Sequence, residues 1–166
     1  PIENVLKGPG EGFPIAMNAL DNSRIGIAAQ ALGIAQGSFE AALNYAHERF
    51  AFGKPIAHHQ SIGNYLAEMA TKTTAARLMV YKAALAKERH YGEGGPRHTK
   101  DASMAKLFAG DTAMWVSERA VQVLGGYGYT TDFPVERFFR DAKITQIYEG
   151  TQEVQRIVIN RSISPE

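Results

Sequence analysis

Apolar residues recur every three or four positions along three long stretches of this sequence, at about residues 14–50, 56–91 and 99–124. This is the spacing of one buried helical face. No run of alternating apolar residues is long enough for a convincing strand. The sequence therefore predicts an all-α fold: an antiparallel bundle of three long helices, completed toward a four-helix bundle by shorter C-terminal helices.

Glycine and proline mark the ends of these helices. Gly53 and Pro55 end the first, the loop at residues 91–96 ends the second, and the glycine pair 125–126 ends the third as a C-terminal cap. On the second helix, the face expected to be buried holds Ile62, Leu66, Met69, Thr73, Ala76, Val80 and Ala84.

The C-terminal region is less regular. We expect a Gly- and Thr-rich turn at residues 127–132, a short helix at residues 133–140 that begins near Pro134, and a last helix from Thr151 to about residue 162. The apolar residues of this last helix should face the bundle; they are Val154, Ile157 and Val158.

The length favours one domain, because 166 residues with 45% apolar side chains can form one core but not two ordinary domains. Residues 1–13, with two prolines and three glycines, are interpreted as a linker from a missing domain, and residues 14–166 as the helical domain. Since there is no initiator methionine, we expect the chain to be cut from a longer protein.

Charge and cysteine content exclude several function classes. Eighteen basic and 17 acidic side chains give a net charge of +1 without a run of five like charges, so nothing indicates a nucleic-acid arm or a membrane-surface patch. No apolar stretch reaches the roughly 18 residues of a membrane span. The absence of cysteine excludes disulfides, thiolate metal sites and a cysteine nucleophile.

Glu149 is the best candidate for a catalytic base. Gly150 lets the backbone approach a bound molecule, and Thr151 can cap the helix that follows, so free N–H groups lie beside the carboxylate. Base and carbonyl-polarising donors would then share one turn. Taken alone, these residues favour a plainer interpretation, an exposed glutamate in a helix-entry turn.

Three separated motifs stand in a specific order. They are Arg-Phe-Ala-Phe-Gly-Lys-Pro at residues 49–55 with Gln60, Gln-Val-Leu-Gly-Gly-Tyr-Gly at residues 122–128, and Arg-Asp-Ala-Lys at residues 140–143 leading into Tyr-Glu-Gly-Thr at residues 148–151. Each motif alone is weak, but together, over residues 10–161, they resemble the C-terminal domain of the acyl-CoA dehydrogenases. Residues 1–13 would then be the exit from the central β domain of such an enzyme.

The resemblance gives Glu149 a defined role. In this family the matching glutamate takes the α-proton of an acyl-CoA thioester while the β-hydrogen leaves as hydride to flavin N5. The glutamate backbone N–H and a flavin ribityl hydroxyl polarise the carbonyl. A subgroup of the family carries its base at the position of Ser23; because serine cannot act as that base, Glu149 remains the candidate.

The resemblance also implies a substrate site around residues 21–24, with Arg24 near the base. Arg24 could instead be a helix-surface arginine paired with Asp21 three residues earlier. Tyr148 could shape the acyl pocket. The substrate-binding candidates are Asp21, Asn22, Ser23, Arg24, Tyr148 and Gly150.

For the cofactor FAD, the resemblance implies three groups of residues. Arg49, Phe52 and Gln60 match positions on the pyrophosphate and adenine side, where a guanidinium suits a phosphate. Residues 122–126 resemble the segment that reaches the FAD of a neighbouring subunit. Thr151 and Glu153 match positions beside the ADP part, although Glu153 could instead be a favourable acid in a first helical turn. The full set is Arg49, Phe52, Gln60, Gln122, Val123, Leu124, Gly125, Gly126, Thr151 and Glu153.

A metal site is not expected. His58 and His59 are adjacent, so on a helix they point in different directions, and no Glu-x-x-His pair occurs that would suggest a di-iron bundle. Besides a dehydrogenase, the sequence leaves two functions open: an acyl-CoA oxidase-like relative that passes electrons to oxygen, and a non-catalytic helical bundle used for oligomerisation.

The resemblance carries further expectations for the whole protein. It implies fatty acid β-oxidation with a preference for short acyl chains, a homotetramer built as a dimer of dimers, and electron-transfer flavoprotein as the electron acceptor. The location would be the bacterial cytoplasm or the mitochondrial matrix. The isolated chain should be inactive or nearly so, because the flavin and CoA sites of this family need the missing middle domain.

Overall fold

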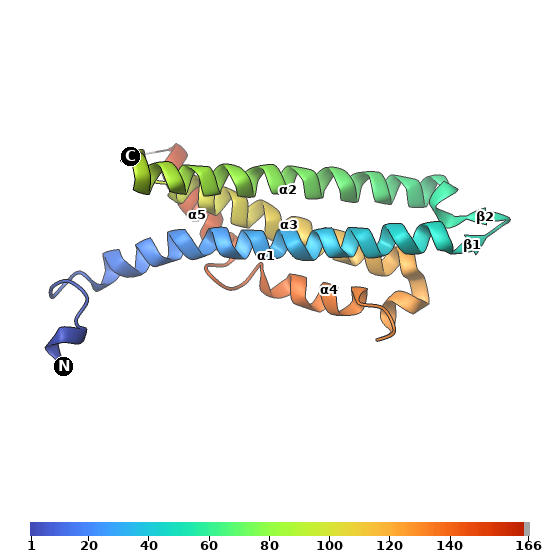
Figure 1. The fold of residues 1–166 in the computed structure, drawn as a ribbon, viewed down its shortest axis with the longest axis horizontal. Coiled ribbons are helices and arrows are strands. Elements are labelled where there is room, and N and C mark those ends of the chain that lie inside the picture. Colours follow the sequence, from blue (N-terminus) through green and yellow to red (C-terminus); the bar gives the residue numbers. More distant parts are fainter. Residues whose placement is uncertain (165–166) are drawn as a thin grey trace.

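Three long helices lie side by side in the computed structural model, which describes residues 1–164. They are α1 (Gly12–Glu48), α2 (Gln60–Glu93) and α3 (Thr99–Leu124). The chain reverses direction between α1 and α2 at one end of the bundle and between α2 and α3 at the other (Figure 1). The predicted all-α antiparallel bundle is confirmed.

Two shorter helices complete the fold. A 3₁₀ segment, η3 (Gly125–Tyr129), follows α3 and leads to α4 (Val135–Ile144), and a turn then leads to α5 (Gln152–Ile163). Because α3 contacts each of the other four helices, it is the centre of the bundle. The connection between α4 and α5, which carries Glu149, therefore lies close to α3.

Alanine dominates the core. Ala28 and Ala35 of α1 and Ala109 and Ala113 of α3 are fully buried, and their small side chains let the helices approach closely without loss of helix propensity. On α2, the predicted face is buried from Leu66 to Val80, as expected. In its last turns the buried alanine is Ala83 and not Ala84. This change follows from the 3.6-residue helical period, which shifts the inward position along a long helix.

A small hairpin that the sequence did not predict joins α1 to α2. Strands β1 (Phe50–Ala51) and β2 (Lys54–Pro55) pair antiparallel, and the 3₁₀ segment η2 (Ile56–His58) follows. Phe52 and Gly53 form the two-residue turn with φ values of 51° and 79°, as a type I′ turn requires. Such short strands give no alternating pattern that sequence analysis can detect.

Helix α5 differs from expectation in which face it buries. The apolar spacing predicts that Val154 and Ile157 face inward, but they are 39% and 51% exposed. The buried residues of this helix are Gln152 and Gln155. The reason is local: Nε2 of Gln155 donates to the carbonyls of Glu149 and Gly150, and Nε2 of Gln152 donates to the Leu107 carbonyl and the Asp111 carboxylate of α3.

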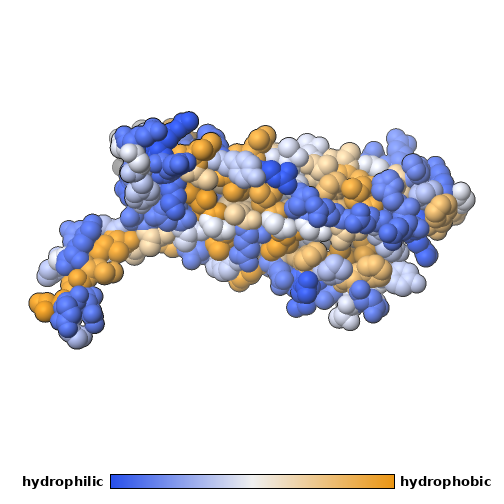
Figure 2. Space-filling model, in the orientation of Figure 1, coloured by the Kyte–Doolittle hydropathy of each residue, from blue (hydrophilic) through white to orange (hydrophobic). Residues whose placement is uncertain are grey.

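The first residues form an arm that extends from the bundle and contains a 3₁₀ turn, η1 (Ile2–Asn4). Figure 2 shows apolar side chains on this arm, and Ile2, Leu6 and Phe13 are each more than 70% exposed. Within residues 1–164, none of the helices combines the length and the apolar character that crossing a membrane requires.

Candidate functional site

Glu149 lies in a left-handed turn between α4 and α5. Its φ is 57° and that of Gly150 is 93°, so two consecutive residues have the conformation that favours glycine. Thr151 is the N-cap of α5 and its side-chain oxygen accepts from the Val154 N–H, which confirms the predicted cap. The half-buried Glu149 carboxylate therefore stands directly before a helix N-terminus.

Ser23 of α1 reaches this carboxylate. Its hydroxyl donates to Oε2 of Glu149 across 2.5 Å. The turn is tied to α1 a second time, because the Tyr148 hydroxyl donates to the side-chain oxygen of Gln30. The fold thus brings together three of the predicted site residues, Ser23, Tyr148 and Glu149.

Donors from α3 and α5 hold the carbonyl side of the turn. Nε2 of Gln155 donates to the carbonyls of Glu149 at 3.2 Å and Gly150 at 2.9 Å, and Nζ of Lys106 donates to the Gly150 carbonyl at 2.8 Å. The backbone N–H groups of Glu149 and Gly150 have no acceptor within residues 1–164. These N–H groups are available to a bound molecule.

Sequence reasoning missed Lys106 and the two glutamines. Lys106 is fully buried on α3, and burial lowers the pKa of its ammonium from 10.5 to about 8. Its signal in the sequence is a lysine in register with the alanines of a buried helical face, at positions 102, 105 and 109. Gln152 and Gln155 gave no such signal, because they stand in an ordinary polar helix start.

Asp21 and Arg24 form a buried ion pair. Nη1 of Arg24 lies 2.9 Å from Oδ1 of Asp21, and the Arg24 and Asp21 side chains are only 5% and 7% exposed. The other carboxylate oxygen of Asp21 accepts from the Thr99 hydroxyl at 2.5 Å. Arg24 is therefore not a helix-surface arginine, although it does pair with Asp21. Its Nε is buried without an acceptor in the described chain.

Asn22 points to a different partner. Its side-chain amide donates to the Tyr91 hydroxyl of α2 at 3.0 Å and to the Asn18 carbonyl at 2.9 Å. Of the predicted substrate segment, only Ser23 makes a hydrogen bond to Glu149 within residues 1–164. Asp21 and Arg24 form the buried ion pair, and Asn22 bonds to Tyr91 and Asn18.

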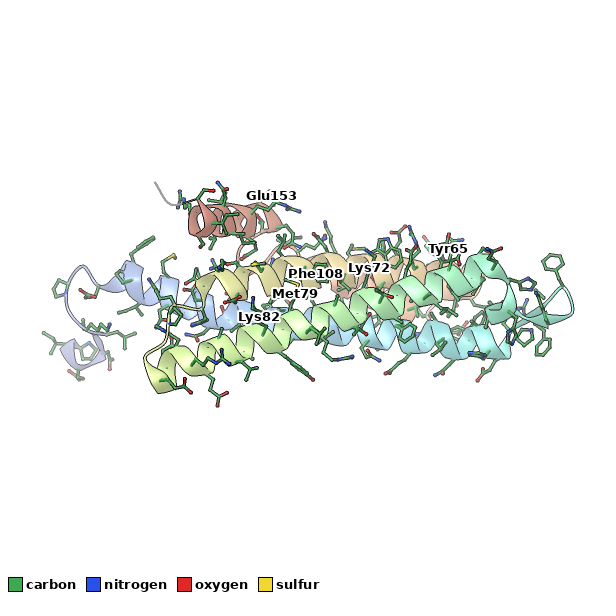
Figure 3. All side chains as sticks on the ribbon, turned by 90° about the horizontal axis from the view of Figure 1, so that it is seen from above. Tyr65, Lys72, Met79, Lys82, Phe108 and Glu153 are labelled. Carbon is green, nitrogen blue, oxygen red and sulfur yellow. The ribbon has the colours of Figure 1, made fainter. Side chains whose placement is uncertain are left out.

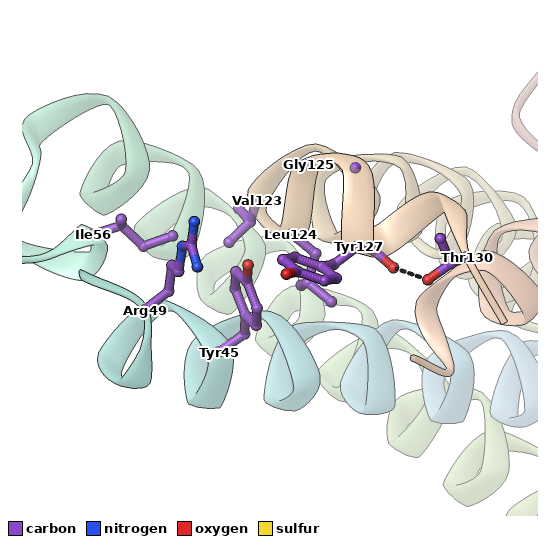
Figure 4. A pocket seen from close by; sticks show the side chains of 9 residues that line it. Tyr45, Arg49, Ile56, Val123, Leu124, Gly125, Tyr127 and Thr130 are labelled. Carbon is purple, nitrogen blue, oxygen red and sulfur yellow. Dashed lines mark hydrogen bonds between the residues drawn. The ribbon is translucent and has the colours of Figure 1, made fainter. Parts of the chain in front are cut away.

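A groove at the hairpin end of the bundle collects part of the predicted cofactor set. It has a volume of about 460 Å³ and lies between the end of α1 and the end of α3 (Figure 4). Arg49 is exposed there, with its guanidinium carbon 5.9 Å from the centre of the Tyr127 ring. Val123, Leu124, Gly125 and Gly126 form the facing wall.

Three other cofactor candidates lie near this end but outside the groove. Phe52 projects from the tip of the hairpin and is 97% exposed, while Gln60 is exposed at the start of α2. Gln122 lines a separate cavity next to Tyr129 and Arg140. The His59 ring shares a hydrogen bond with the Ala51 carbonyl at 3.0 Å, and it thereby braces the hairpin.

Thr151 and Glu153 are distant from that groove and lie beside Glu149. Glu153 is on the outer side of α5 (Figure 3). Hydrogen bonds from its own backbone N–H and from the Thr151 hydroxyl lower the pKa of its carboxyl group, which fits a first-turn acid. The cofactor candidates therefore form two groups at different places along the bundle, one at the hairpin and one at the α4–α5 turn (Figure 1).

Comparisons with known proteins identify the family of this chain. The family model for the acyl-CoA dehydrogenase C-terminal domain matches residues 10–164. A short-chain specific acyl-CoA dehydrogenase of Clostridium acetobutylicum is 52% identical over 98% of this chain and 42% of its own length. An acryloyl-CoA reductase (NADH) of Anaerotignum propionicum is 50% identical over 98% of this chain and 40% of its own.

A solved structure shares the fold as well as the sequence. Butyryl-CoA dehydrogenase from Megasphaera elsdenii superposes with a TM-score of 0.93 and is 52% identical, covering 98% of this chain and 41% of that one. The chain thus spans about two fifths of the length of the curated relatives it matches. The match extends over nearly all of the described residues and includes the motifs around Arg49, Gly125 and Glu149, and on this ground the chain belongs to the acyl-CoA dehydrogenase family, as its C-terminal domain.

Proposed function

We propose that this chain supplies the base for the α,β-dehydrogenation of an acyl-CoA thioester to the trans-2-enoyl-CoA, with Glu149 taking the α-proton. One observation carries the proposal: the Glu149 carboxylate and the unbonded N–H groups of Glu149 and Gly150 share one turn. An α C–H next to a thioester is a weak acid, so a carboxylate can remove its proton only if the carbonyl is polarised at the same time. The free N–H of Glu149 is such a donor.

Residues 21–24 and Tyr148 would bound the acyl-CoA beside this turn. Ser23 donates to the Glu149 carboxylate, and the buried Nε–H of Arg24, which has no acceptor in the described chain, could donate to a ligand. Relatives named as short-chain specific and butyryl-CoA enzymes support short acyl groups as the substrate class.

The residues at the hairpin end fit an anionic cofactor, for which we propose FAD. Arg49 makes none of the ion pairs found within residues 1–164, and a Cβ built on Gly125 or Gly126 would meet no atom within 4 Å, so a guanidinium and an open backbone face the same groove. A planar guanidinium binds phosphate oxygens in pairs. The flavin would accept the β-hydrogen as hydride.

The separation of the two groups of cofactor candidates supports an assembly of several copies. The groove at Arg49 and Gly125 lies at the hairpin, whereas Thr151 and Glu153 adjoin the base (Figure 1). One copy can serve one cofactor with the first group and another cofactor with the second. We propose the homotetramer of the family, with electron-transfer flavoprotein as the acceptor, in the bacterial cytoplasm or the mitochondrial matrix.

The reverse reaction is a second candidate, because one relative at 50% identity is named an acryloyl-CoA reductase. In that direction a protonated Glu149 would return its proton to the α-carbon. Because the same residues would serve both directions, the activity assay also includes an enoyl-CoA with NADH, and oxidation of NADH would reveal the reductase reaction.

The test uses the protein encoded by the full gene, purified with its flavin. We expect short-chain acyl-CoA to bleach the flavin absorbance, and Glu149→Gln to abolish bleaching while the flavin stays bound. Glu149→Asp is the matched control, which keeps a carboxylate and should retain some rate. Bleaching that persists in Glu149→Gln would place the base elsewhere, and peroxide formed during turnover in air would identify an oxidase-like relative.

A further inference from the structure

Lys106 is the largest side chain that the fold buries completely. It lies on α3 in register with buried alanines, and it makes none of the ion pairs found within residues 1–164. An ammonium taken out of water without a carboxylate partner carries a large desolvation cost. Its burial therefore has to be compensated by specific contacts.

These contacts lead to the turn that carries Glu149. Nζ of Lys106 donates to the Gly150 carbonyl at 2.8 Å and to Oε1 of Gln152 at 3.3 Å. Nε2 of Gln155 donates to the same Gly150 carbonyl and to the Glu149 carbonyl. Of these two donors, Lys106 comes from α3, whereas Gln155 belongs to the helix that the turn begins.

The backbone of this turn needs such support. A residue other than glycine at φ 57° costs roughly 1–3 kcal/mol and persists only where its surroundings fix it. Because the N–H and C=O of a trans peptide point in opposite directions, holding the carbonyls of Glu149 and Gly150 also fixes the N–H groups of Gly150 and Thr151. The direction of the base side chain depends on the same backbone.

The charge of Lys106 acts at the same place. The charged groups that face it are Asp111 on its own helix, Arg24 on α1, Glu149 in the turn and Glu153 on α5. Burial lowers the pKa of Lys106 to about 8, so the amine is charged at neutral pH and loses its charge just above. The neutral amine still donates hydrogen bonds, so pH separates the effect of charge from that of hydrogen bonding.

We propose that Lys106 is a positioning residue for the base. It holds the Glu149–Gly150 turn through the Gly150 carbonyl and supplies a positive charge that stabilises the negative charge developing on the substrate carbonyl oxygen. The inference rests on the proposed function of Glu149 and assigns a role to a residue that does not touch the substrate.

The test compares Lys106→Met, which removes donor and charge, with Lys106→Gln, which keeps a neutral donor. Met69→Ala is the control, because Met69 is a fully buried core residue whose truncation destabilises the bundle, and it lies on α2, whereas the hydrogen bonds to the turn come from α1, α3 and α5. The full protein is used throughout. One measurement is the rate of flavin bleaching at saturating acyl-CoA below and above pH 8, and the other is hydrogen exchange of the peptide that covers residues 145–153 without substrate.

Lys106→Met should lower the bleaching rate about 10- to 100-fold with little change in the acyl-CoA concentration needed for half saturation, since misplacing a reacting group costs rate more than binding. Its turn should exchange faster. The wild-type rate should fall as pH rises through about 8, and both Lys106 variants should lack that step. Lys106→Gln should show slower exchange than Lys106→Met, and Met69→Ala should match the wild type in both measurements.

Wild-type rates and exchange in both Lys106 variants would overturn the inference. If Lys106→Met does not fold, Lys106→Gln decides alone. If wild-type protein shows no bleaching with any acyl-CoA, the proposed function fails, and hydrogen exchange still decides whether Lys106 holds the turn.

Discussion

The hydroxyl of Ser23 donates to Oε2 of Glu149 across 2.5 Å, although 126 positions of sequence separate the two residues. The Leu20 carbonyl lies 3.2 Å from the same hydroxyl. A hydroxyl has one proton, and the shorter contact to a carboxylate is the stronger of the two. Helix α1 therefore helps to aim the proposed base, from the position at which a subgroup of this family carries its own glutamate.

Replacing Ser23 should slow proton removal. In Ser23→Ala the Glu149 carboxylate loses this donor and samples more orientations, so we expect the rate of flavin bleaching to fall about tenfold, the equivalent of one charge-assisted hydrogen bond. Stopped-flow absorbance measures this rate. Ser38→Ala is the control, because Ser38 is a buried serine of the same helix without a hydrogen-bond partner in the described chain. Equal rates in both variants would contradict a role for Ser23.

Gly150 should not tolerate even alanine. Its φ is 93°, and an added Cβ would lie 2.7 Å from Nε2 of Gln155, which holds the turn. We expect Gly150→Ala to lower the free energy of unfolding by roughly 1–3 kcal/mol and to reduce activity. Thermal unfolding provides the measurement. Gly33→Ala in α1 meets nothing within 4 Å and should instead stabilise by about 0.5–1 kcal/mol. The same sign of change in both variants would disprove this account.

The buried pair of Asp21 and Arg24 should be costly to break. Arg24→Met removes the buried cation from the Asp21 carboxylate and leaves only the exposed Arg97, 3.9 Å away, so we expect a loss of about 3–5 kcal/mol in the free energy of unfolding. Denaturant titration measures it. The matched control is Lys82→Met, which removes a 70% exposed cation 3.1 Å from Asp101, and it should cost less than about 1 kcal/mol. Similar midpoints for the two variants would count against the prediction.

The long helices and the cap of the last helix could be predicted from the sequence, because both depend on patterns that one segment carries by itself. Apolar spacing predicted the long helices, and Thr151 caps its helix for the same local reason. The sequence did not predict that Arg49 lies beside Gly125, because this proximity arises only when the ends of α1 and α3 pack together.

The polar surroundings of the base could not be predicted. Gln155 is buried and Ile157 exposed because the carbonyls of the left-handed turn need donors, and that need arises only once α3 and α5 meet. Lys106 and Ser23 come from other helices, so no local pattern links them to Glu149. Apolar patterning assigns a face to a helix, but it does not reveal a buried polar network.

Arg49 should be needed to retain the flavin. If its guanidinium binds the cofactor phosphates, Arg49→Ala should weaken flavin binding about 10- to 100-fold, as expected for the loss of charged hydrogen bonds. The ratio of flavin to protein absorbance after desalting measures retention. Arg89→Ala, an exposed arginine near the other end of α2, is the control and should retain its flavin. Full flavin content in Arg49→Ala would remove Arg49 from the cofactor site.

The stability of the fold should rise with pH above about 8. The pKa of Lys106 is lowered from 10.5 to about 8 in the folded chain, mainly by burial. Between these two values the unfolded chain holds a proton that the folded chain has released, so the free energy of unfolding increases with pH, at up to about 1.4 kcal/mol per pH unit. Below pH 8 both states are protonated at this site and its contribution does not change. Denaturant titrations at several pH values measure the slope.

The contribution of Lys106 is isolated by comparing the pH slopes of variants. Lys106→Met and Lys106→Gln lack the amine and should lose this upward slope, whereas Lys82→Met, which removes an exposed lysine from α2, should keep it. Burial disfavours the ammonium form, so Lys106 lowers the stability of the wild type most at neutral pH, where it is charged. Relative to the wild type, the free energy of unfolding of both Lys106 variants should therefore be highest at neutral pH, apart from the hydrogen bond to Gly150 that they lose. Parallel pH curves for wild type and Lys106→Gln would mean that Lys106 titrates at its ordinary pKa in the folded chain.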